Sequence, residues 1–271
     1  MGCNTIIIGK DNLEKYISDS VNDDLSYKIN ESSNSKILFL LSTLKDININ
    51  IDIEDNATIK MVFFVSSNYS YNLNINLKRD SSLELYTSDK NSGDSKIVKT
   101  INLLGENSSF KGYEFISSLN NKITGGFYVN HLSKNTTADS KLNYLSNENG
   151  YINRDAVATI EKGMDNSNSS ENIKGIILNN NSRIDSKPVL VISCDDVHAS
   201  HGCAIGTIDD NEIYYLMSRG LSKEDSLKII CKSLINPILR EINDDDFYSI
   251  IKPLIFSTIG EWNERVISCV N

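Results

Sequence analysis

Polar turns recur along this chain at nearly constant spacing, and this regularity restricts the fold more than any other feature. Between residues 36 and 205, short alternating or fully apolar runs such as "ININIDI", "YNLNINL" and "SLELYTS" are separated by such turns. Alternation with period two is typical of β-strands. The turns lie near Asn56, Asp80, Asn107, Asn135 and Gly163. Their spacing, roughly 25 to 28 residues, indicates a repeat protein.

Each repeat combines a polar turn, a few small residues and an apolar strand. Asn and Asp tolerate the left-handed backbone of a tight corner, and their side chains can cap it. A β-solenoid needs such a corner in every coil, because each coil buries its apolar face only by stacking on its neighbours. An antiparallel β-sandwich with regularly spaced turns also fits, so the pattern alone leaves two folds open, both of them mainly β.

After Gly206 the pattern changes to helical spacing. Asp209 is a candidate N-cap, and Gly220 stands where a left-handed residue ends a helix. The next helix opens with Ser222-x-x-Asp225, close to a capping box. The apolar stripe of that helix includes Cys231, and a last helix is expected through Phe247, Ile251, Leu254, Ile255 and Trp262.

Three further expectations concern the layout of the chain. The segment "DNLEKYISDSV" (Asp11 to Val21) predicts a short helix near the start. Pro237 and Pro253 are expected to bend or interrupt the late helices. We therefore divide the chain into a short N-terminal segment (1–35), a β core (36–206) and a C-terminal helical subdomain (207–271).

Composition narrows the possible functions. The formal net charge of -9 leaves no basic face for nucleic acid. The longest apolar runs are far shorter than the ~20 residues of a membrane-spanning helix. The five cysteines are scattered and form no C-x-x-C pair, which argues against a disulfide framework and favours a reducing cytoplasm. A phosphate-binding glycine loop, a G-x-S-x-G elbow and an H-E-x-x-H pair are all absent from the sequence.

The segment "CDDVHASHGCAIG", residues 194 to 206, concentrates the metal-binding residue types. In an extended strand, alternate side chains share a face. Cys194, Asp196 and His198 would then point one way, and His201 and Cys203 the other. An imidazole and a thiolate on one face suit a soft metal or a cluster, with further ligands from elsewhere. Gly202 between them either bends the strand or lets another backbone approach.

Other uses of these residues remain open at this stage. His201 and Cys203 could form a nucleophilic pair, although residues two apart on a strand rarely come within hydrogen-bond reach and no third group is evident to orient them. Cys194 is expected to be an inert small residue, and His198 is expected to be a surface side chain. Core or structural roles are expected for Cys231 and His131, and Cys3 and Cys269 lie near the ends of the chain.

The stretch from Ser186 to Ile235 resembles the C-terminal signature of the SufB/SufD family of iron–sulfur cluster assembly proteins. The resemblance rests on "KP" at 187–188, "DDV" at 195–197, "SHG" at 200–202, and "IGTIDDNEIYYLMSRG" at 205–220. It is good for roughly the last hundred residues. It implies a right-handed parallel β-helix followed by a C-terminal helical subdomain.

The resemblance also implies a function. Family members are non-ATPase subunits that pair with a sister β-helix chain, while their C-terminal helices dock an ABC-type ATPase, SufC. A transient Fe–S cluster would form at the interface between the β-helices. The chain itself would be a scaffold and not an enzyme.

This chain is similar to the SufD type rather than the SufB type. Ser200 and Gly202 replace the glutamates that flank the histidine in the SufB type, and the SufD histidine corresponds to His201. SufD proteins often carry a cysteine where this chain has Ala199, and usually an alanine where it has Cys203. Cys203 is therefore a second candidate ligand. Three alternatives remain: a minimal scaffold that pairs with a second copy of itself, a stand-alone Cys/His metal-binding protein, and a purely structural paralogue.

Overall fold

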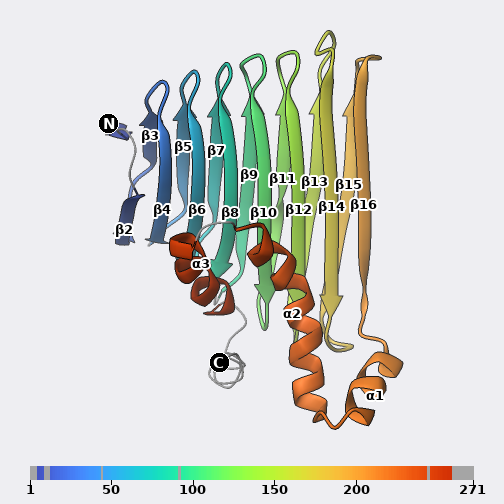
Figure 1. Ribbon diagram of the computed structural model, residues 1–271. Coiled ribbons are helices and arrows are strands. Elements are labelled where there is room, and N and C mark those ends of the chain that lie inside the picture. Colours follow the sequence, from blue (N-terminus) through green and yellow to red (C-terminus); the bar gives the residue numbers. More distant parts are fainter. Residues whose placement is uncertain (1–4, 9–12, 44, 91–92, 243–244, 258–271) are drawn as a thin grey trace.

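The computed structural model describes residues 5–8, 13–43, 45–90, 93–242 and 245–257, and most of these form two parallel β-sheets. Consecutive strands alternate between the sheets, so each coil of the chain contributes one strand to each (Figure 1). Every strand pairing is parallel, which excludes the antiparallel sandwich. The protein is a parallel β-solenoid, and the predicted fold class is confirmed.

The two sheets contain the odd-numbered and the even-numbered strands respectively. The odd sheet consists of β1 (Thr5–Ile8), β3 (Leu25–Ile29), β5 (Ile47–Ile53), β7 (Tyr71–Leu77), β9 (Ser95–Leu103), β11 (Lys122–His131), β13 (Tyr151–Ile160) and β15 (Arg183–Ile192). The even sheet consists of β2 (Leu13–Val21), β4 (Asn34–Thr43), β6 (Thr58–Ser67), β8 (Ser82–Lys90), β10 (Ser109–Ser118), β12 (Thr137–Ser146), β14 (Ser167–Ile177) and β16 (Val197–Thr207).

The predicted Asn and Asp corners have left-handed backbone. The φ angle is positive at Asn56, Asp80, Asn107, Asn135 and Asn166. The backbone N–H of each donates to a carbonyl in the next corner, for example from Asp80 to Glu106 at 2.9 Å. The coil length grows along the chain, from 24 residues at one ladder position to 31 at another. In the last of these corners the ladder position is taken by Asn166, although Gly163 also has a positive φ.

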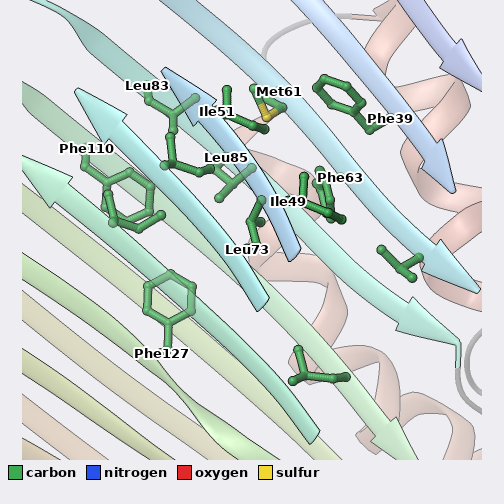
Figure 2. Close-up of a cluster of buried hydrophobic side chains, with 14 of the residues drawn as sticks. Phe39, Ile49, Ile51, Met61, Phe63, Leu73, Leu83, Leu85, Phe110 and Phe127 are labelled. Carbon is green, nitrogen blue, oxygen red and sulfur yellow. The ribbon is translucent and has the colours of Figure 1, made fainter. Parts of the chain in front are cut away.

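The space between the sheets, called here the solenoid interior, is filled by apolar side chains from both sheets (Figure 2). Phe39 and Phe63 of the even sheet pack there with Ile49, Ile51 and Leu73 of the odd sheet. On the outer face of the odd sheet, asparagine amides form ladders from coil to coil, such as Asn76 to Asp52 at 2.8 Å and Asn102 to Asn76 at 2.9 Å. The many asparagines of the chain thus pair its coils on the outside.

The helices α1 (Asp210–Ser218), α2 (Lys223–Glu241) and α3 (Asp245–Ser257) follow the last strand. The predicted caps are present: Asp209 accepts from the N–H of Asn211, and Ser222 accepts from the N–H of Asp225. Together α2 and α3 pack against part of the outer face of the even sheet, toward the ends of its strands (Figure 1). Their apolar residues pack against outward side chains of that sheet, including Leu38, Val62, Tyr86, Phe115 and Leu145.

One sequence expectation about local structure is wrong, and another is wrong in part. Residues 13–21 form strand β2 and not a helix. The segment contains Tyr16, Ile17 and Val21, which favour extended backbone, and pairing with β4 decides in favour of a strand. Pro237 and Pro253 both lie inside a helix, so of the two effects expected of them interruption is absent, and bending stays a prediction.

The remaining expectations on layout are only partly tested. Asp11 and Trp262 lie outside the described residues. The division into domains stays a prediction, although the two sheets begin before residue 36.

Candidate functional site

Strands β15 and β16 form the last coil of the solenoid, and each has an open edge in the described part of the chain (Figure 1). β16 pairs with β14 and β15 with β13, and the opposite edge of each is uncovered. Ile192, on the interior face in register with the buried Ile160, is 42% accessible, whereas the exposed Val189 and Val191 lie on the outer face of β15. The interior of the solenoid is therefore open at this end.

The register of β16 on β14 fixes the direction of the candidate ligands. His201 pairs with Glu171, and Cys203 pairs with Ile173. Glu171 and Ile173 are buried, with 2% and 0% accessibility, and Ile173 belongs to the interior core. In a parallel pairing, residues in register share a face. His201 and Cys203 therefore lie on the interior face, and they are exposed because no further coil of the described residues covers them.

The predicted division of the segment into two faces is confirmed for its strand residues. His198 pairs with the exposed Asn168 and is itself exposed, as expected of a surface side chain. Cys194 and Asp196 precede the strand and lie in the corner, where the Cys194 thiol contacts a carboxylate oxygen of Asp165 at 3.1 Å. Gly202 does not bend the strand, because the register continues unchanged through it.

The pKa values of the Cys203 thiol and of the Glu171 carboxyl are both raised above those of fully solvated groups. Although the Cys203 side chain is exposed, partial loss of solvent around its sulfur raises the pKa of the thiol, so the thiol form is favoured until a metal displaces the proton. Burial raises the pKa of Glu171 to about 7. Neither carboxyl oxygen of Glu171 has a hydrogen-bond partner among the described residues, and the same holds for the Oγ of its neighbour in the previous coil, Ser140.

Glu171 was not among the sequence candidates. Its alternation with Ser169 and Ile173 places it on an apolar-facing position, which is a signal for burial. Its proximity to His201 could not be read from the sequence, because it depends on the length of the coil between β14 and β16. The structure therefore adds one acidic residue to the predicted pair.

The other cysteines and histidines do not join this site. Cys231 is buried against the even sheet, as predicted, and burial raises its pKa to about 12. His131 is buried at the end of β11, where its Nδ1 lies 2.7 Å from the Thr136 hydroxyl. Cys3 and Cys269 lie outside the described residues. Within the described ranges, no group of three or more His, Cys, Asp or Glu side chains is arranged to hold a metal ion.

A second polar cluster lies deeper in the solenoid interior and is internally neutralised. Lys99 contacts Asp89 at 2.7 Å and Glu114 at 2.9 Å. Arg154 contacts Glu114 at 3.1 Å and donates to the Ile97 carbonyl at 2.6 Å. All four charged side chains are fully buried. Because these charges compensate one another, we interpret this cluster as part of the structural core.

Comparison with known proteins identifies the family. The family model described as the SUF system FeS cluster assembly SufBD core domain matches residues 21–234. The chain belongs to the SufBD core family. The resemblance stated for the segment Ser186 to Ile235 is thereby confirmed, and the match extends it across most of the β-solenoid. As a SufBD family protein, the chain belongs to a family of Fe–S cluster assembly proteins.

Individual relatives of this SufBD protein match over shorter stretches. The iron–sulfur cluster assembly protein SufD of Bacillus subtilis is 33% identical over 86 residues, 32% of this chain and 20% of that protein. SufD of Escherichia coli is 33% identical over 93 residues, 32% of this chain and 21% of that protein. A SufBD family protein of Pyrococcus horikoshii is 40% identical over 67 residues, 25% of this chain and 15% of that protein.

Among the described residues, none of the helices combines the length and the apolar character needed to cross a bilayer.

Proposed function

We propose that this chain is a SufD-like scaffold subunit of a SUF-type Fe–S assembly complex. One observation carries the proposal: His201 and Cys203 project from the interior face of a solenoid coil whose edges are open. A chain that docks on this coil would bring its own side chains opposite these two. The Fe–S cluster is then cargo, assembled transiently between two chains and passed on.

The composition of the last coil supports docking through its edges. Soluble proteins usually protect a free sheet edge with charged residues or proline. The described residues of β16, "VHASHGCAIGT", contain no proline, lysine, arginine, aspartate or glutamate. β15 differs, because it carries Pro188 and three charged residues, although its last residues "VLVI" are apolar and expose Val191 and Ile192. The β16 edge is therefore the one suited to strand pairing, and we assign it to a SufB-type sister chain.

The helices supply a second surface. In α1, Ile213 is buried, whereas Tyr214, Tyr215 and Met217 are 75%, 56% and 43% exposed. Exposed aromatic and methionine side chains are enriched at protein interfaces. We assign the surface of α1 to an ABC-type ATPase of the SufC kind, whose ATP hydrolysis would drive the two β-solenoids to rearrange. The chain would then act as a scaffold without catalysis of its own, in the cytoplasm as expected from its cysteine usage.

Copurification tests these assignments. The chain is coexpressed with an ABC-type ATPase and a SufB-type chain from the same genome, with an affinity tag on the ATPase only. We expect all three chains to elute together. Replacement of Tyr214 by Ala should release this chain from the ATPase, whereas Tyr69→Ala, at a 43% exposed tyrosine distant from the helices along the chain, should not. Failure of the unmodified chain to elute with the ATPase contradicts the proposal.

Self-pairing is a second candidate, because the same open edge accepts a second copy of the chain equally well. Sedimentation of the purified chain distinguishes the two arrangements. A dimer that persists when the SufB-type chain is present favours self-pairing, and exchange into a mixed complex favours the sister-chain arrangement. A stand-alone Cys/His metal protein would instead retain metal tightly as a monomer with no ATPase present.

A further inference from the structure

Among the described residues, two glutamates are buried in the solenoid interior, and they differ sharply in their surroundings. Glu114 accepts bonds or ion pairs from Lys99, Arg154 and Tyr144. Glu171 is 98% buried, since its accessibility is 2%, and neither of its oxygens has a hydrogen-bond partner among the described residues. Burial of a carboxyl group without a partner costs stability, and an apolar residue would pack there at no such cost. Glu171 therefore calls for an explanation that Glu114 does not.

The position of Glu171 supplies that explanation. It lies one coil below the open end, in register with His201 on β16, and on the same face. Neighbouring strands are about 4.8 Å apart, so side chains in register on one face can reach a common atom between them. Ser140, in register with Glu171 on β12, adds a buried hydroxyl with no partner in the described part of the chain. The interior thus has a short polar row that ends at His201.

The donor types indicate the ligand. A carboxylate and an imidazole together suit ferrous iron, which accepts oxygen and nitrogen donors. We propose that Glu171 is a metal ligand. Together with His201 it forms a site with two protein ligands for a ferrous ion, between the last two coils. The inference rests on the proposed function and deepens it, because it assigns to this chain the delivery of iron, with the remaining donors supplied by the docked chain. Cys203 lies next to this pair on the same face.

The three histidines of the chain allow a site-specific test. His201 is the site residue, His198 is an exposed imidazole on the opposite face of the same strand, and His131 is buried. The purified chain, labelled at its histidine rings, is titrated with Co²⁺ as a paramagnetic probe for ferrous iron and followed by NMR. His201→Ala and His198→Ala assign the ring signals. We expect the His201 ring to be shifted at lower Co²⁺ concentration than the His198 ring.

The decisive variant is Glu171→Gln, which keeps the shape of the side chain and removes its charge. Loss of a partner that only orients a ligand weakens metal binding about 10–100-fold, so loss of a donor should raise the Co²⁺ dissociation constant at His201 at least about tenfold. Glu161→Gln, at an exposed corner carboxylate, should leave it unchanged. Thermal unfolding of Glu171→Gln at the same pH shows whether the variant is folded, and we expect no loss of stability.

Two results overturn the inference. One is a His201 response that is equal in the unmodified chain and in Glu171→Gln. The other is the absence of any preferential response of His201 in the unmodified chain. Neither result affects copurification with the ATPase and the SufB-type chain, so the failure of this inference is distinguishable from the failure of the proposed function.

Discussion

The neutral balance of the buried charge cluster predicts the cost of removing one carboxylate. Glu114 faces Lys99 at 2.9 Å and Arg154 at 3.1 Å, and all three side chains are fully buried. In Glu114→Gln, Lys99 keeps its contact with Asp89 at 2.7 Å. Arg154 keeps only neutral partners, such as the Ile97 carbonyl at 2.6 Å. The cluster, which holds two cations and two anions, then carries an uncompensated positive charge.

Breaking a buried ion pair by removal of one partner costs about 3–5 kcal/mol, because the other charge stays buried without compensation. We expect Glu114→Gln to lower the free energy of unfolding by this amount, a large part of the about 5–15 kcal/mol typical of a domain. The assay is urea unfolding of the full chain followed by circular dichroism. The matched control is Glu84→Gln on the neighbouring strand β8, whose side chain is 22% exposed and contacts Lys60 at 3.2 Å. Partly exposed pairs contribute about 1 kcal/mol or less.

The same cluster predicts a dependence on pH. Burial alone would raise the pKa of Glu114, but Arg154 and Lys99 outweigh burial and hold this pKa below its usual value. Stability from this carboxylate is therefore present above pH about 4.5, the value for an unfolded glutamate, and is lost as the pH falls through the lower folded value. Glu114→Gln should lack this component. Equal losses in Glu114→Gln and Glu84→Gln at neutral pH would refute the assignment of the cluster to the core.

Three further predictions concern other parts of the molecule. Burial lowers the pKa of His131 to about 4, so between pH 6.5 and 4 the unfolded chain binds a proton that the folded chain does not. The free energy of unfolding should therefore fall by up to about 3 kcal/mol over this range. Urea unfolding at both pH values should show this fall in the unmodified chain and not in His131→Gln. Ile238→Ala removes a buried side chain of α2 and should cost about 2–5 kcal/mol, whereas Ile229→Ala, 44% exposed on the same helix, should cost less than about 0.5 kcal/mol in thermal unfolding. Ala204→Lys places a charge on the open β16 edge and should release the SufB-type chain while the ATPase still copurifies; retention of both would count against edge pairing.

The regular parts of the fold could be predicted from the sequence because each depends on local chemistry. Asn and Asp at the corners adopt positive φ, and strand alternation separates interior from outer residues. The helix caps at Asp209 and Ser222 follow from short patterns of side-chain acceptors. The strand β2 was mistaken for a helix because its conformation is decided by pairing with β4, which the local pattern does not contain.

The site could be predicted only in part, for the same reason. The shared face of His201 and Cys203 follows from strand alternation. That Glu171 lies beside His201 depends on the register between two coils. The sequence pattern does not fix this register, because the coils differ in length. The charge cluster did leave a signal, since Lys99 alternates with the interior residues Ile97 and Ile101. A charged residue at an interior position of a strand thus indicates a buried charge cluster, although the sequence does not show which residues of other coils pair with it.

Anaerobic reconstitution of the three-chain complex tests the central claim most directly. The complex is supplied with ferrous iron and sulfide, and cluster build-up is followed by its visible absorption for the unmodified chain, His201→Ala and His198→Ala. The two histidines lie on opposite faces of β16, so they separate the interior site from the surface. We predict that all three complexes assemble and that only His201→Ala loses cluster build-up. Undiminished build-up in His201→Ala, with the complex intact, would contradict the account.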